Sequence, residues 1–368
     1  MSKISIQSPY FPNEERPQHT FLRLRQPVNE ASYPAPRVLK PGFNYRFSFA
    51  FVVPARLVPP VCNHETSNDH VEQSHTLLPP TLGDHSDLAD YGTCRPDDMC
   101  PSMCGISYRI CVSVLKKSKG EDGTSSSVSL SASKTVRIIP TVEEDPPMSV
   151  SEVDSGYCMR KEKKVRRAFL HSTLGRLVVD AVQPKPIQFF VPHCTSNESA
   201  TTAVTLNLRF EPVGEEQPPQ LGTVRSGIRV FTFYSTNPWI DYPSPAFEKC
   251  LALLGYQMYA KTVSSPTLSI ANSAWVKHPT YYTTSVVVPI ILPKDKVFVP
   301  TFHSCWLSRI YSLDLGVSYH APNVNIMTST ASLRIPIQVA KERNNVASPE
   351  YPVPEENTDG PPPAYTDW

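Results

Sequence analysis

Proline most strongly limits what this chain can fold into. The 368 residues include 39 prolines but only 14 glycines. A proline inside a helix costs about 3 kcal/mol, because its ring removes a backbone donor and clashes with the preceding turn. Strand ends and turns tolerate proline, and apolar residues make up 40% of the chain. The sequence therefore predicts an all-β protein, and its length fits two domains.

Local patterns place the expected strands. Five aromatic residues, at positions 43, 45, 47, 49 and 51, alternate with other residues, which predicts one face of a strand. Residues 1–20 are polar and contain prolines, so we expect a loop there. A short helix is expected over 69–78. Further strands are expected near residues 21–25, 108–114, 128–139, 170–182, 201–210, 227–234, 286–292, 297–302, 310–319 and 331–339.

Composition also divides the chain. Residues 142–159 are acidic, contain Pro146 and Pro147, and are expected to be a linker between a domain at 1–141 and a domain at 160–341. Residues 344–368 contain six prolines and five acidic residues but no lysine or arginine. Such a segment buries too little apolar surface to order itself. We therefore predict a disordered, proline-rich tail over 342–368.

Charge and hydrophobicity exclude several classes of protein. The formal net charge of +1 gives no general reason to expect nucleic acid binding. No run of 18 apolar residues predicts a membrane span, and the first residues do not resemble a secretory signal. The nine cysteines are then expected to be reduced thiols inside the cell, which predicts a cytoplasmic protein.

The tail contains a recognition motif. Pro362, Pro363, Ala364 and Tyr365 form a PPxY sequence. Prolines hold the extended polyproline II conformation, which WW-type modules bind in aromatic grooves. The alternative is an ordinary frayed chain end.

A weaker second motif lies earlier in the tail, at Pro349 and Tyr351. There Ser348 stands where the motif has its first proline. Residues 349–352 also form a PxxP sequence, typical of SH3 ligands, but the tail lacks the basic residue that those ligands usually carry. WW recognition is therefore favoured for the tail.

One dense basic run opens the second predicted domain. Its members are Arg160, Lys161, Lys163, Lys164, Arg166 and Arg167. The simpler interpretation is a solvated strand. The functional interpretation is a patch for anionic lipid headgroups or acidic receptor tails, since each basic residue near an anionic membrane contributes about 1 kcal/mol. A nuclear localisation signal is a third possibility.

No motif predicts catalysis or a metal. Four cysteines lie close together with His85 nearby, but their spacing is not the paired C-x2-4-C of structural zinc sites. They are Cys94, Cys100, Cys104 and Cys111. His64, Glu65 and His70 only approximate H-E-x-x-H, because histidines six residues apart face different sides of a helix, and His75 does not complete the motif. We predict no catalytic residue, no metal and no cofactor.

Several segments resemble fungal arrestin-related trafficking adaptors. Residues 299–313 and 332–339 are similar to strands of the family's C-terminal domain. Residues 45–54, 77–83 and 144–147 are similar to its N-terminal domain. The resemblance covers nearly all of residues 20–340. It implies two tandem immunoglobulin-like, arrestin-type β-sandwich domains.

The resemblance also raises an expectation about the start of the first domain. Family members have several strands before the equivalent of Phe21, so we expect that domain to be incomplete at its start. The phosphate-sensing charged core of other arrestins lies partly in those strands and has no equivalent residues here.

The resemblance and the PPxY motif together imply a non-enzymatic adaptor. Its domains would bind the cytosolic tail of a membrane transporter or receptor. Pro362 and Pro363 would enter the groove of a WW domain in a HECT-type ubiquitin ligase, and Tyr365 the adjacent pocket. The ligase would modify the cargo and promote endocytosis, so we expect peripheral recruitment to the plasma membrane or endosomes. Three alternatives remain: an arrestin-fold signalling scaffold without ligase recruitment, an enzyme using a cysteine or histidine of residues 62–111, and a degenerate fragment of the family.

Overall fold

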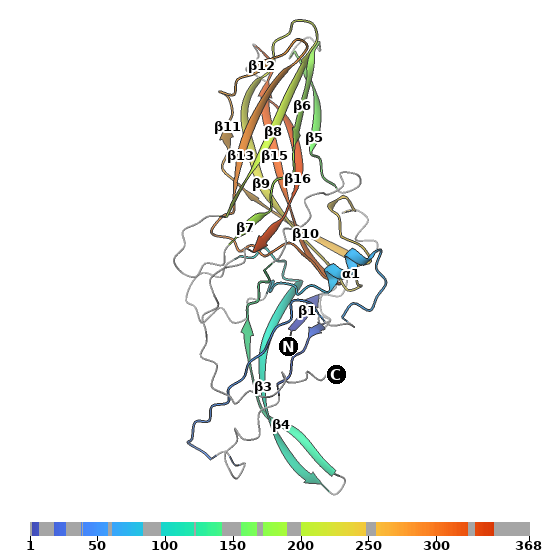
Figure 1. The fold of residues 1–368 in the computed structure, drawn as a ribbon, viewed down its shortest axis with the longest axis vertical. Coiled ribbons are helices and arrows are strands. Elements are labelled where there is room, and N and C mark those ends of the chain that lie inside the picture. The colour runs from blue at the N-terminus through green and yellow to red at the C-terminus, as the bar shows by residue number, and fades with distance from the viewer. Residues whose placement is uncertain are drawn as a thin grey trace, which may run out of the picture.

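The structure is a computed structural model, and strands are its main regular elements (Figure 1). It describes residues 2–6, 18–26, 38, 40–57, 61–83, 97–120, 123–141, 156–167, 172–189, 200–247, 255–322 and 328–341. The predicted all-β class is confirmed, because several antiparallel sheets dominate and α1 (Asp69–His75) is the only α-helix among the described residues.

The second half of the chain forms two facing sheets. The strands of the first are β5 (Arg160–Arg166), β6 (Thr173–Ala181), β8 (Thr201–Pro212), β12 (Val276–Lys277) and β13 (Tyr282–Ile291). Their order is β12-β13-β8-β6-β5, which makes β5 an edge strand of the described sheet.

The second sheet has the path β10-β9-β15-β14, with β11 on β9 and β16 on β15. Its strands are β9 (Gln220–Ser235), β10 (Tyr256–Ser264), β11 (Leu268–Ser269), β14 (Phe302–His303), β15 (Leu307–His320) and β16 (Ser329–Ile337). A short 3-10 helix, η3 (Pro245–Phe247), precedes β10. A parallel pair, β7 (Ile187–Phe189) and β17 (Val339–Lys341), completes this half.

Alternation of side chains builds the sandwich core. In β8, every second residue from Val204 to Phe210 is buried while the residues between them are exposed. Val230 of β9 and Leu313 of β15 lie in the same cluster from the opposite sheet. Strand β9 is buried on both faces, because Val230 enters this core while Phe233 belongs to another cluster with Trp239.

The first half contains a smaller sheet of order β2-β1-β3-β4. Its strands are β1 (Ser2–Ile6), β2 (Gln18–Leu22), β3 (Cys104–Gly120) and β4 (Gly123–Val136). The prediction that residues 1–20 form a loop is wrong, because β1 lies between β2 and β3 in this sheet. Ile4 and Ile6 are each 1% exposed. Two isoleucines at a spacing of two are enough to give β1 one buried face.

The aromatic alternation between residues 43 and 51 does not form the predicted strand. Residues 43–54 have an irregular backbone, and Phe43 and Phe49 are 66% and 54% exposed. Alternation stabilises a strand only when a neighbouring strand pairs with it and a core covers its apolar face. None of the described strands pairs with this segment.

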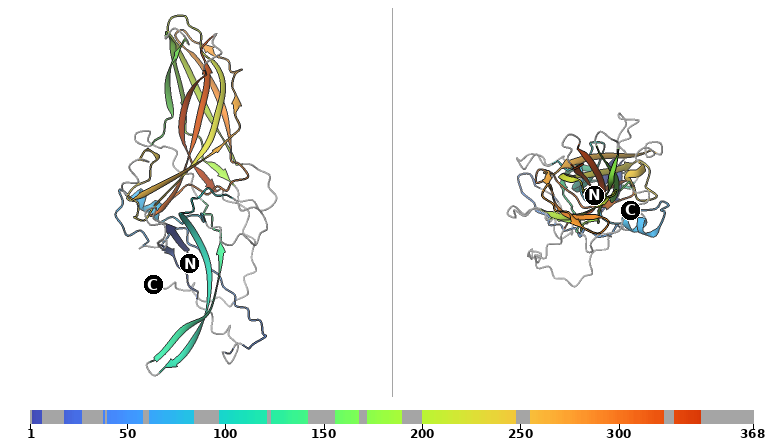
Figure 2. Two further views of the ribbon diagram at one scale, coloured as in Figure 1. Left: turned by 180° about the vertical axis from the view of Figure 1, so that it is seen from behind. Right: turned by 90° about the horizontal axis from the view of Figure 1, so that it is seen from above.

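The two halves of the chain share a hydrophobic cluster where they meet, a region that we call the waist. Figure 2 shows the ribbon of this region from behind. Leu82 and Ile106 of the first half pack in this cluster with Tyr234 and Leu307 of the second. Polar contacts add to it. The fully buried guanidinium of Arg309 donates through Nη1 to a backbone carbonyl oxygen of the first half, that of Asp98, at 3.0 Å.

Asp97 supplies a second polar link. One of its carboxylate oxygens lies 2.5 Å from Lys261 Nζ and 3.3 Å from Lys296 Nζ, and both lysines belong to the second half. The two halves are therefore held together at the waist by apolar packing, hydrogen bonding and ion pairs, and we call this contact the joint.

Most of the predicted linker, and the whole tail at 342–368, lie outside the described residues. The division into domains at 1–141 and 160–341 therefore stays a prediction. In the part of the chain that the structure describes, no helix has the length and apolar character needed to cross a bilayer.

Candidate functional site

The residues of the predicted tail motifs are not placed by the structure. Pro362, Pro363 and Tyr365 lie outside the described residues, as do Pro349 and Tyr351 of the weaker motif. Their role remains a prediction from sequence.

The predicted basic run lies on strand β5. Lys161, Lys164 and Arg166 are exposed, whereas Val165 is buried against the sandwich core. Acidic neighbours partly balance the charge. Arg160 lies 3.1 Å from a carboxylate oxygen of Glu162, and Arg167 lies 3.1 Å from one of Glu216. The run is thus a solvated edge strand with an exposed basic face.

The structure does not gather the predicted cysteine group into one site. Cys94 and His85 lie outside the described residues. The Sγ atoms of Cys100 and Cys104 lie 3.9 Å apart. Cys111 is exposed on β3, seven residues beyond Cys104, which corresponds to about 23 Å along a strand.

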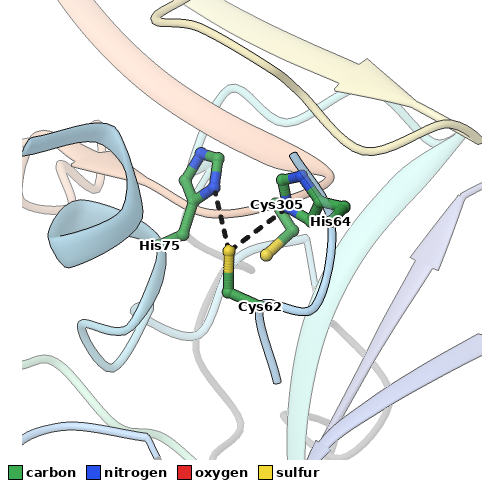
Figure 3. A group of neighbouring side chains, drawn as sticks. All are labelled: Cys62, His64, His75 and Cys305. Carbon is green, nitrogen blue, oxygen red and sulfur yellow. Dashed lines mark hydrogen bonds between the residues drawn. The ribbon is translucent and has the colours of Figure 1, made fainter. Parts of the chain in front are cut away.

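A different group of cysteines and histidines does meet, at the waist. Figure 3 shows the side chains of Cys62, His64, His75 and Cys305 pointing toward one another. Their ligand-capable atoms all lie within 4.8 Å of one another. Cys62 Sγ lies 3.4 Å from His64 Nε2 and 3.7 Å from His75 Nδ1. His75 and Cys305 are buried, and the other two are half-buried.

Helix α1 fixes the position of His75. The side chain of Asn68 caps the helix by accepting hydrogen bonds from the backbone N–H groups of His70 and Val71, at 3.0 and 3.1 Å. Val71 is completely buried. The hydroxyl of Tyr242, from the second half, donates to the His70 carbonyl at 2.9 Å. The helix is thus held against the second half, and its last residue, His75, faces the cluster.

A tight turn between β14 and β15 presents Cys305. Ser304 closes this turn, since its Oγ donates to the Leu307 carbonyl at 2.6 Å and accepts the Leu307 N–H at 3.2 Å. The backbone carbonyl of Cys305 accepts the backbone N–H of Trp239 at 2.7 Å. The thiol of Cys305 donates to the Val61 carbonyl at 3.8 Å. The thiol is therefore positioned by backbone contacts on both sides of the joint.

Burial controls the protonation of the cluster. It lowers the pKa of His75 to about 4, with a further contribution from neighbouring His64. Burial also raises the pKa of the Cys62 and Cys305 thiols. Reactive cysteines have the opposite property, a lowered pKa in an electropositive setting. The cluster therefore consists of a neutral His75 and two protonated thiols, which a bound cation would deprotonate.

His64 and His75 were expected only as an incomplete match to H-E-x-x-H, and as part of the range 62–111 from which an alternative enzyme could draw a cysteine or histidine. The C-x-H-x10-H spacing of Cys62, His64 and His75 is the local signal for this group. Cys305 lies in the other half of the chain, and no spacing rule connects residues so far apart. Only the packing of the joint brings the fourth side chain into place.

Comparison with known proteins adds no family. A scan against protein-family models finds no match, and a search of curated proteins finds none either.

Proposed function

We propose that the chain is an arrestin-like adaptor that binds a membrane cargo and recruits a WW-domain ubiquitin ligase of the HECT type. Its β-sandwich domains would hold the cytosolic tail of a transporter or receptor. Its PPxY motif would bring the ligase to that cargo, so that ubiquitination promotes endocytosis. The protein would work in the cytoplasm, recruited to the plasma membrane or endosomes.

The observation that carries this proposal is a PPxY motif in a proline-rich, acidic segment that follows an all-β chain. Strand β17 ends at Lys341, and Pro362 to Tyr365 come about twenty residues later. A proline-rich linker extends by about 3 Å per residue, so this separation would let the motif reach a partner away from the sandwich.

An exposed apolar hairpin supports a role in binding other proteins. Strands β3 and β4 extend away from the rest of the molecule (Figure 1). Their apolar side chains are 43% to 69% exposed, a surface type that often marks an interaction site. These side chains are Val112, Val114, Leu115, Val128 and Leu130. The basic face of β5 is a second candidate surface, suited to acidic receptor tails or anionic headgroups.

The decisive experiment measures binding of the full chain to an isolated WW domain of a HECT-type ligase. Tyr365→Ala removes the aromatic anchor, and such anchors typically contribute 2 kcal/mol or more, so we expect binding about 30-fold weaker. Tyr351→Ala is the matched control, because it removes a tyrosine from the same tail but from the weaker motif. Unchanged binding by Tyr365→Ala would contradict the proposal.

A second measurement separates the adaptor from a signalling scaffold. Deleting residues 344–368 should stabilise the cargo at the membrane if the tail recruits the ligase. A scaffold without ligase recruitment predicts unchanged cargo turnover.

A further inference from the structure

We propose that Cys62, His64, His75 and Cys305 bind one Zn²⁺ as a closed structural site that joins the two halves of the chain. The proposal rests on the geometry of the cluster and is independent of the adaptor function. Zn²⁺ prefers four ligands drawn from cysteine and histidine, and two of each is one of its common structural sets.

The spacing of the ligand atoms fits a zinc tetrahedron. With Zn–S near 2.3 Å and Zn–N near 2.0–2.1 Å, a sulfur and a nitrogen ligand lie about 3.6 Å apart. The two sulfur–nitrogen separations at Cys62 are 3.4 and 3.7 Å. Tetrahedral ligands as a whole lie about 3.3 to 3.8 Å apart, so the limit of 4.8 Å on this cluster requires contraction of any pair by about 1.5 Å at most.

Hydrogen bonding orients the first histidine for metal binding. His64 Nδ1 lies 2.9 Å from the carbonyl oxygen of Glu65. A carbonyl only accepts hydrogen bonds, so Nδ1 carries the proton in this contact and Nε2 keeps its lone pair. That lone pair faces Cys62 Sγ. A ligating histidine typically donates its other N–H to a carbonyl in this way, which fixes its tautomer and its orientation.

The ligand types favour zinc over Mg²⁺ and Ca²⁺. Two thiolates and two neutral imidazoles balance the charge of a divalent ion. Mg²⁺ and Ca²⁺ require oxygen ligands, and no carboxylate belongs to this group. Four protein ligands leave no position for a substrate or a reactive water, so the site is structural.

The origin of the ligands defines what the site does. Three come from the segment between residue 62 and the end of α1, and Cys305 comes from the turn between β14 and β15. A bound ion would therefore link two parts of the chain that are remote in sequence. It would add coordinate bonds to a joint that otherwise relies on apolar packing and a few polar contacts.

The test uses the full chain, purified with a reducing agent, incubated with ZnCl2 and freed of unbound metal. Elemental analysis should find about one zinc ion per chain, the stoichiometry of a single Cys2His2 site. The midpoint temperature of thermal unfolding should rise with the concentration of ZnCl2, since a ligand that binds only the folded state stabilises that state. A folded wild-type chain that retains no zinc overturns the proposal.

Variants assign the ion to this cluster. Cys305→Ser and His64→Gln each remove one ligand, and chelator competition should show zinc held at least about 100-fold more weakly, because loss of even a supporting hydrogen bond costs 10 to 100-fold. His64→Gln changes a half-buried side chain outside regular structure, so it decides the question if Cys305→Ser fails to fold. Zinc retained by His64→Gln with wild-type affinity would refute the assignment.

Two controls exclude other thiols. Cys111→Ser removes an exposed cysteine and Cys100→Ser disrupts the Cys100–Cys104 pair, and both should keep one tightly bound ion. Loss of zinc in Cys100→Ser with retention in Cys305→Ser would place the ion elsewhere and overturn the proposal. A disulfide between Cys62 and Cys305 that persists in the reduced sample would also overturn it. Such a disulfide would lower the intact mass by two hydrogens, and Cys305→Ser would abolish that difference.

Discussion

The charge of Asp97 offers a direct measure of how the joint is stabilised. Its carboxylate lies between Lys261 and Lys296, and its other oxygen accepts the Met99 N–H at 2.8 Å. Asp97→Asn keeps an oxygen for the Met99 contact but puts an NH2 group where the other oxygen faces the two lysines. The variant therefore removes both the charge and the hydrogen-bond acceptor of these contacts between the two halves.

The magnitude follows from the pKa of the Asp97 carboxyl. The hydrogen bond from Lys261 is the main cause that lowers this pKa from 3.8 to about 2. One pKa unit corresponds to about 1.4 kcal/mol, so the fall corresponds to about 2.4 kcal/mol. The Asp97 side chain is 40% exposed, and solvent screens such pairs, so we expect Asp97→Asn to cost about 1 kcal/mol at neutral pH.

The dependence on pH has a definite sign. A carboxyl whose pKa is lower in the folded state contributes stability above its unfolded pKa and loses it as the pH falls toward its folded pKa. The difference in unfolding free energy between wild type and Asp97→Asn should therefore have its full value at neutral and mildly acidic pH, above 3.8. It should disappear as the pH falls through about 2.

Equilibrium urea unfolding, followed by tryptophan fluorescence, tests this reasoning. Trp306 is a suitable reporter, because its ring stacks on His19 of the first half at 4.4 Å. The matched control is Asp295→Asn, since the Asp295 side chain is 72% exposed and also lies 3.3 Å from Lys296. The control should change stability by less than about 0.5 kcal/mol. Equal costs for the two variants, or no effect of Asp97→Asn at low salt, would refute the argument.

Two further predictions concern packing. Gly175→Ala should destabilise the protein by about 2 kcal/mol, because the added Cβ would lie 2.4 Å from Phe210 Cζ and close to fixed backbone. Gly316→Ala is its control, since its nearest neighbour lies at 3.4 Å, and urea unfolding should barely distinguish it from wild type. Tyr311→Phe should cost about 1–2 kcal/mol in the same assay, because the buried Tyr311 hydroxyl donates to the Val299 carbonyl at 2.7 Å. An unfolding free energy of Tyr311→Phe equal to that of wild type would contradict that estimate.

The sandwich of the second half was predictable where its strands are long and their apolar side chains alternate or form a continuous run. Strand β8 alternates cleanly from Val204 to Phe210, and β15 alternates from Leu313 to Tyr319. In β8 the pattern matches the burial of one face, whereas β15 is buried along most of both faces. The helix α1 was predictable for a similar reason, since Asn68 caps a short segment whose Val71 is buried.

The first half was less predictable because its first strand depends on a distant partner. Strand β1 has only five residues, and it is defined by pairing with β3, about a hundred residues later. The aromatic segment from Phe43 to Phe51 has a much stronger local pattern but forms no strand. Local alternation indicates which face a strand would bury. Pairing with another strand in the fold decides whether the strand forms.

The candidate site was unpredictable because it, too, depends on a residue that is distant in sequence. Cys62, His64 and His75 give a local signal, but two imidazoles and one thiol are an incomplete set. The fourth side chain, Cys305, is brought in only by the turn that Ser304 closes.

The shared cluster at the waist has a consequence for how the protein is made. Leu82 and Ile106 pack against Tyr234 and Leu307, so the first half emerges from the ribosome long before its own core can be completed. At about 5–20 residues per second, the delay between residues 106 and 307 is on the order of 10 to 40 seconds. During synthesis, the nascent first half exposes apolar surface that only the later strands cover. Fragments that end before β15 should therefore depend on chaperones and be prone to aggregation.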